Sequence, residues 1–144
     1  MTGADRWRDN WRVVGPPGSV RVVVARRRRA GSRPPEVAEL PLGTPVVLLD
    51  SGPGALRRSR RFAAAAAVRL ESEYLAFPSA ATPAYLVEDS PAVLRTFVTH
   101  VLVAPPRTVV SAIVDAGLWL LRLWTPWRVV RRVAPGRVTV GRRA

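Results

Sequence analysis

Two short apolar runs in the first third of the chain have the length and composition of β-strands. The run "SVRVVVA" occupies Ser19–Ala25 and is rich in β-branched residues, and the run "PVVLL" begins at Pro45. β-Branched side chains are enriched in strands. A continuous apolar run between turn residues is typical of a strand that is buried on both faces in a parallel sheet. The pattern therefore predicts two strands, the second of them fully buried.

The next segment predicts a helix followed by two strands. The stretch "ALRRSRRFAAAAAVR" begins at Ala55 and predicts a helix of about four turns, because alanine has the highest helix propensity. In "RLESEYLAF", Arg69–Phe77, polar and apolar residues alternate, which predicts a strand with one partly solvated face. The run "AYLVE", Ala84–Glu88, predicts a second short strand.

The last third of the chain predicts two helices and a final strand. Ser90 followed by Pro91 is a typical helix start. The helix that follows has one apolar stripe, interpreted as core packing: Val93, Leu94, Phe97, Val98, Val101 and Leu102. A second, mostly apolar helix is predicted at about 108–124, and "GRVTVGRR", Gly136–Arg143, predicts an edge strand.

Taken together, these elements predict a single small α/β domain. With 144 residues, 48% of them hydrophobic, the chain is long enough for one core and too short for two ordinary domains. We expect a short, mostly parallel sheet with flanking helices over residues 19–144. Residues 1–18 mix tryptophans, charges and "GPPG", which predicts a loosely ordered basic and aromatic arm.

The charge of the chain favours an anionic partner. The formal net charge is +13, and all 23 basic residues are arginine. Arginine stays charged, and its forked guanidinium binds phosphate, so nucleic acid or an acidic membrane is the expected partner class. The alternative is that a GC-rich genome enriched arginine together with Ala, Val, Gly and Pro, and the sequence leaves both explanations open.

Six arginines are the predicted contacts to such an anionic surface, and polyanion binding is expected to be weak and independent of sequence. The run Arg26–Arg29 is interpreted as a solvated loop, and the alternative is a contact to nucleic acid. In the helix from Ala55 the arginines crowd the N-terminal half, where the helix dipole disfavours cations, so a bound anion would relieve that cost. The six predicted contact residues are Arg57, Arg58, Arg61, Arg128, Arg131 and Arg132.

The segment "DSGPG" after the second strand admits two interpretations. Asp50, Gly52 and Gly54 match the start of the acid-x-Gly-x-Gly pattern of S-adenosylmethionine (SAM) sites, with Glu71 near the distance at which an acid binds ribose hydroxyls. Against this, Leu56 stands at the third glycine position, and Pro53 removes an amide that would face the ligand. A strand-to-helix turn without a ligand is the simpler interpretation.

The sequence offers few other candidates for catalytic or metal-binding residues. His100 is the single histidine and is expected on the polar face of its helix. The sequence has no GxSxG elbow and no P-loop. The absence of cysteine excludes disulfides, thiolate zinc sites and cysteine nucleophiles. Glu71 and Glu73 lack further ligands nearby, so no metal site is predicted, and catalytic residues stay unassigned.

From Gly43 to Arg143 the chain resembles the C-terminal half of class I SAM-dependent methyltransferases. The resemblance rests on the order of "RRSRRFAAAAAVRLESEYLAFPSAATPAYLVEDSPAVLRTFV", a long apolar helix and "APGRVTVGRR". It implies a truncated or degenerate relative that lacks the cofactor half. Such a domain would be non-catalytic alone, would bind no cofactor as an isolated chain, and would act by binding a partner protein or an anionic surface. The alternative is a minimal methyltransferase that binds SAM through Asp50, Gly52 and Gly54.

A third hypothesis is a basic protein bound peripherally to a membrane. The segment Val109–Arg132 is apolar but contains Asp115 and Arg122, which disfavour a transmembrane span. Its tryptophans and arginines suit the interface of an anionic bilayer, and the alternative is that this helix covers the sheet of the domain. The N-terminus carries acids and arginines with no apolar segment behind them, which is not typical of a secretion signal. We therefore expect a cytoplasmic protein that is soluble or peripherally membrane-bound.

Overall fold

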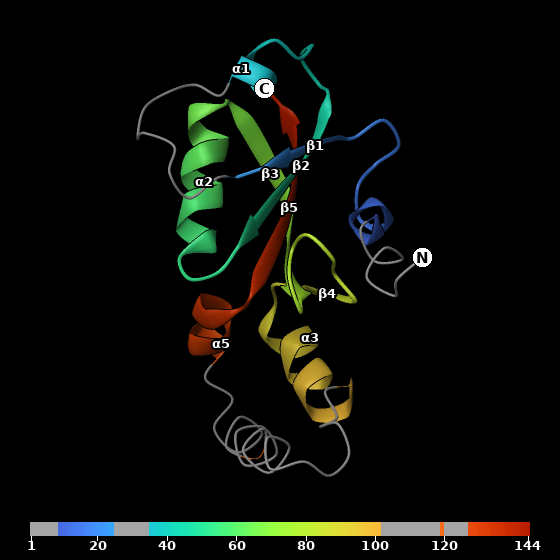
Figure 1. Cartoon of the computed structure of the whole chain (residues 1–144), viewed down its shortest axis with the longest axis vertical. Helices are drawn as coiled ribbons and strands as arrows, with labels where there is room; N and C mark the ends of the chain where they lie inside the picture. Colours follow the sequence, from blue (N-terminus) through green and yellow to red (C-terminus); the bar gives the residue numbers. More distant parts are fainter. Residues whose placement is uncertain (1–8, 25–34, 102–118, 120–126) are drawn as a thin grey trace.

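A computed structural model describes residues 9–24, 35–101, 119 and 127–144 as a five-stranded sheet with helices packed against it (Figure 1). Each predicted strand is present. The elements, in chain order, are the 3-10 helix η2 (Asn10–Val13), β1 (Val20–Val23), α1 (Pro35–Ala38), β2 (Pro45–Ser51), α2 (Ala55–Ala65), β3 (Val68–Phe77), β4 (Tyr85–Glu88), α3 (Pro91–Thr96), the π-helical turn η3 (Phe97–Val101), α5 (Trp127–Val133) and β5 (Gly136–Arg143).

The α/β class is as predicted, but the sheet is mostly antiparallel, so the prediction of a mostly parallel sheet was wrong. The strand order is β1-β2-β5-β3-β4, and β1–β2 is the parallel pair. β5 pairs antiparallel with both β2 and β3, and β3 pairs antiparallel with β4. β2 and β3, which α2 connects, therefore run in the same direction, but β5 separates them. The insertion of the last strand replaces the expected parallel pairing with two antiparallel ones.

The prediction that Gly136–Arg143 forms an edge strand was also wrong, because β5 is the third of five strands. Residues from Gly136 to Gly141 are buried along its length. A Cβ at Gly136 would meet the backbone of Ala80, and a Cβ at Gly141 would meet the carbonyl of Arg69. Both glycines are thus required by close backbone approach at the centre of the sheet.

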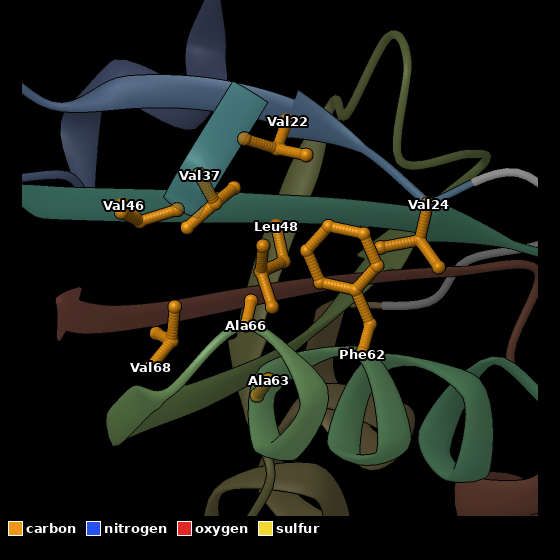
Figure 2. Close-up of a cluster of buried hydrophobic side chains, with 9 residues drawn as sticks. All are labelled: Val22, Val24, Val37, Val46, Leu48, Phe62, Ala63, Ala66 and Val68. Carbon is orange, nitrogen blue, oxygen red and sulfur yellow. The ribbon is translucent and has the colours of Figure 1, made fainter. Parts of the chain in front are cut away.

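One face of the sheet is covered by α2, and Figure 2 shows the apolar cluster between them. Alternate residues of β1 and β2 point to this face, among them Val22, Val46 and Leu48. Phe62 projects from α2 onto them. Further along the same sheet, Leu75 and Val87 pack against α3, η3 and α5 in a second cluster. The helices that carry the arginines are therefore anchored on one face.

The opposite face carries the odd-numbered residues of β2 and the N-terminal segment. Trp11, in η2, is 6% exposed and packs with Val47, Leu49 and Val140. η2 lies on the side of the sheet away from α2 (Figure 1). The part of the expected arm that the structure describes is thus attached to the domain core by Trp11, by Val14, which packs against the same cluster, and by a hydrogen bond of 2.8 Å from the Asn10 side-chain amide to the carbonyl of Pro83.

α2 is shorter than predicted, whereas α3 begins at the predicted residue. α2 ends at Ala65, because Ala67 adopts a φ of 50° and Val68 enters β3. The helix start at Pro91 is confirmed, with the Ser90 side chain accepting a hydrogen bond from the amide of Val93 at 3.3 Å.

The apolar stripe of the helix after Ser90 is only partly buried. Leu94, Phe97 and Val98 are in the core, while Val93 and Val101 are 40% and 43% exposed. The wider π-turn over Phe97–Val101 changes the angular spacing of these residues. Leu102, and the predicted helix at about 108–124 except Trp119, lie outside the described residues. None of the described helices has the length and hydropathy needed to cross a bilayer.

Candidate functional site

The loop after β2 is closed by an arginine of the helix that follows it. Asp50, at the end of β2, is 2% exposed, and its carboxylate accepts two hydrogen bonds from Arg58, at 3.0 Å from Nε and 2.7 Å from Nη2. The same guanidinium donates to the carbonyls of Ser51 at 2.9 Å and Pro53 at 2.6 Å. One arginine therefore satisfies the acid and two carbonyls of the predicted cofactor loop.

The glycines of this loop adopt the backbone conformations that its turns require. Gly52 and Gly54 have φ values of 81° and 78°, which favour glycine over other residues. The Gly52 amide donates to the carbonyl of Pro135 at 2.8 Å, which ties the loop to the start of β5. A Cβ at Gly54 would lie 3.2 Å from the Arg58 guanidinium. The described contacts of this loop are those of a corner between β2 and α2.

Glu71 lies away from the glycine loop, so the structure does not bring together the residues of the alternative SAM site. Asp50 pairs with Arg137 on β5, whereas Glu71 lies at a bulge between Leu70, opposite Gly141, and Ser72. This register separates Glu71 from Asp50 by about 10 Å or more along the strands, with β5 between them. The Glu71 carboxylate instead accepts a hydrogen bond from Arg142 at 3.0 Å.

A second ionic cluster, which we call the Glu73 cluster, joins α2, β3, β5 and α5. Its members are Arg60, Glu73, Asp89, Arg131 and Arg137. Arg60 binds the Glu73 carboxylate through two hydrogen bonds, at 2.8 and 3.0 Å. Arg131 donates to Asp89 at 2.7 Å and to Glu73 at 3.3 Å. Arg137 donates to Asp89 at 2.6 Å and to Glu73 at 3.1 Å. Three arginines thus share two carboxylates.

Burial places the two acids of the Glu73 cluster and Arg137 in the domain interior, while the Arg60 side chain is 52% exposed. The side chain of Arg137 is 2% exposed, that of Asp89 3% and that of Glu73 13%. Burial acts to raise the pKa of Glu73, but the hydrogen bond from Arg60 and the charges of Arg137, Arg60 and Arg131 outweigh it and hold this pKa below its ordinary value. The hydrogen bond to Glu73 in turn raises the pKa of Arg60. Both groups are therefore held in their charged forms.

The two helices that meet at the Glu73 cluster carry the same arginine spacing. α2 contains "RRSRR" at residues 57–61 and α5 contains "RVVRR" at residues 128–132, so both match R-x-x-R-R. The fourth position of each, Arg60 and Arg131, points to Glu73. α2 and α5 contact each other on the same side of the sheet (Figure 1). The shared carboxylate therefore holds the two helices together.

The first and fifth positions of the two motifs form what we call the outer arginines. They are exposed, and within the described residues none of them forms an ion pair with a carboxylate. On each helix the two outer arginines are four residues apart, which places them on one face. The outer arginines are Arg57, Arg61, Arg128 and Arg132.

The structure divides the six arginines predicted to contact an anionic surface. Arg57, Arg61, Arg128 and Arg132 are the outer arginines, whereas Arg58 and Arg131 bind acids of the domain itself. Sequence analysis missed Asp89 and Arg137, which complete the Glu73 cluster. Nothing in the local pattern marks them, because their partners lie 42 and 64 residues away in sequence. His100 is exposed, and the described residues contain no group of acids and histidine that suits a metal ion.

The arrangement thus leaves four exposed guanidinium groups on α2 and α5. No family model matches the chain, and no curated protein or solved structure matches it either.

Proposed function

We propose that this chain is a binding domain, without catalysis of its own, that holds nucleic acid or a similar polyanion on the face formed by α2 and α5. The observation that carries the proposal is the division of the arginines on these helices. Arg58, Arg60 and Arg131 are bound to internal acids, while the outer arginines are exposed and have no carboxylate partner among the described residues.

Three features support anion binding. Internal acids fix the helices, so the outer arginines extend from a platform that does not have to be ordered on binding. Each guanidinium is permanently charged and forks onto phosphate oxygens. The formal net charge of +13 adds long-range attraction to any polyanion. Affinity should therefore come from phosphate contacts and carry no sequence preference.

The test compares two variants of equal net charge by fluorescence anisotropy with a short labelled DNA duplex. Arg57→Gln/Arg61→Gln removes two outer arginines, and Arg69→Gln/Arg95→Gln removes two exposed arginines elsewhere. At about 50 mM salt we expect the first variant to lose at least about tenfold in affinity and the second to lose much less. Equal losses of affinity would show that net charge alone governs binding. A strong preference for one DNA sequence would show that binding is sequence-specific.

An anionic membrane is the second candidate, and one residue favours it. Trp119 is 61% exposed, and solvent-facing tryptophans are typical of proteins that bind bilayer interfaces. The test is co-sedimentation with vesicles of phosphatidylserine and phosphatidylcholine against vesicles of phosphatidylcholine alone. Salt-sensitive binding to the first and none to the second supports it, with a blue shift of tryptophan emission. Unchanged emission and no co-sedimentation exclude it.

The proposed evolutionary origin is a truncated or degenerate methyltransferase-like domain, with a partner protein supplying the cofactor half. The closed Asp50 loop supports the absence of SAM binding by the isolated chain, because Arg58 occupies its carboxylate. Titration calorimetry with SAM tests this, and we expect no saturable heat. Micromolar binding that is abolished by Gly52→Val would instead support the minimal methyltransferase.

A further inference from the structure

A cavity lies where the parallel strands β1 and β2 end. Its volume is about 310 Å³, within the usual range of small-molecule sites. Val23 and Val24 line it from the end of β1, and Leu49 and Ser51 line it from the end of β2. The loop after β3 closes it with Ala80 and Ala81, and Arg21 and Asp50 complete the lining.

The cavity opens on the face of the sheet opposite α2 and the outer arginines. Arg21 and Val23 pair with Val47 and Leu49, which belong to the cluster around Trp11 on that face. Asp50 points the other way, because side chains alternate along a strand and its carboxylate is held by Arg58 under α2. The floor of the cavity is therefore apolar, and the acid at its edge does not face the cavity.

The polar groups at this cavity select for an anion. Arg21 is exposed at its rim and has no carboxylate partner among the described residues. The Ser51 side chain, on the same face, accepts or donates no hydrogen bond within the described residues and is also exposed. We propose that the cavity binds a small amphipathic anion, with its apolar part on Val23, Leu49 and Ala81 and its charged head on Arg21.

This site is independent of the proposed polyanion face, so each can fail without the other. The test is a titration of the isotopically labelled full chain with octanoate, followed by amide chemical shifts. We expect saturable shifts at Val23, Ser51 and Ala81. 1-Octanol, which has the same chain without the charge, should bind at least about tenfold more weakly, since a charge-assisted hydrogen bond is lost.

Two variants and two controls complete the experiment. Arg21→Gln should weaken octanoate binding about tenfold, and Ala81→Phe, at an exposed lining position, should abolish it by filling the cavity. Arg12→Gln, on the same side of the sheet, and Arg57→Gln/Arg61→Gln should leave it unchanged. Absence of saturable shifts at the cavity amides, equal binding of octanol, or shifts confined to α2 and α5 would each overturn the proposal.

Discussion

Replacing Glu73 by glutamine removes one of two carboxylates that three arginines share. Glutamine has nearly the same shape but no charge, and its amide group would face the guanidinium groups that now donate to Glu73. Asp89 would remain as the single acid beside Arg60, Arg131 and Arg137. The Arg137 guanidinium cannot replace its lost hydrogen bond to Glu73 with one to water, because its side chain is 2% exposed.

The expected cost follows from the burial of Glu73 and from the hydrogen bonds that its carboxylate accepts. Glu73 is 13% exposed and accepts hydrogen bonds from three arginines at 2.8 to 3.3 Å. Removing one partner of a buried ion pair costs about 3–5 kcal/mol, because the remaining charge is uncompensated. A domain of this size has a free energy of unfolding of about 5–15 kcal/mol. Glu73→Gln should therefore remove a large fraction of it and lower the unfolding midpoint.

Urea unfolding followed by circular dichroism measures this cost, with Glu71→Gln as the matched control. Glu71 is two residues earlier on β3, and its pair with Arg142 is 32% and 47% exposed. Exposed pairs contribute about 0–1 kcal/mol. We therefore expect a difference of at least about 2 kcal/mol between the two variants. Equal free energies of unfolding for both, or a loss below about 1 kcal/mol for Glu73→Gln, would refute the assignment of a buried ionic cluster.

Four further outcomes are expected from the ion pairs and the close backbone approach described above. The pKa of Glu73 is lowered in the folded chain, so the stability that Glu73 contributes is present above its unfolded pKa of about 4.3 and is lost as the pH falls through its folded pKa. Glu73→Gln should therefore make the free energy of unfolding depend less on pH in the acidic range, measured by urea unfolding at neutral and acidic pH. Arg137→Met should cost less than Glu73→Gln, about 1–2 kcal/mol, because two arginines then balance two carboxylates; a larger loss would contradict the charge count. Gly136→Ala should destabilise by about 1–3 kcal/mol, since its Cβ meets the Ala80 backbone, and a neutral effect in thermal unfolding would argue against β5 as the central strand. Asp50→Asn should lower stability by about 1–3 kcal/mol in the same assay, whereas an acid needed only for a ligand would leave the free protein unaffected.

Local signals in the sequence were enough to find the five strands, α2 and the start of α3, but not η2, α1 or α5. The apolar run from Pro45 indicated a buried strand, and Ser90 with Pro91 marked the start of α3. These signals act within a few residues, through side-chain alternation, propensity and capping. The end of α2 was placed too late, because the alanine run favours a helix while the pairing of Val68 with Arg143 favours a strand.

The order of the strands and the Glu73 cluster were not predictable in this way. The position of β5 depends on contacts with β2 and β3, and nothing local in "GRVTVGRR" distinguishes a central strand from an edge strand. Gly136 and Gly141 were the available signal, because glycines within a strand often mark a close backbone approach. Likewise, Arg57 and Arg60 look equivalent in sequence, and only the position of Glu73 beneath α2 separates an outer arginine from one that is bound to an acid of the domain.

The salt dependence of DNA binding tests the central claim most directly. The logarithm of the binding constant falls with the logarithm of salt concentration by about 0.9 for each phosphate contact. A variant with glutamine at all four outer arginines should therefore lose about 3–4 units of slope relative to the unmodified chain. The control variant carries glutamine at Arg12, Arg21, Arg69 and Arg95, so both variants have a net charge of +9, four below +13. We predict a nearly unchanged slope for the control, and the same loss of slope in both variants would contradict a binding face on α2 and α5.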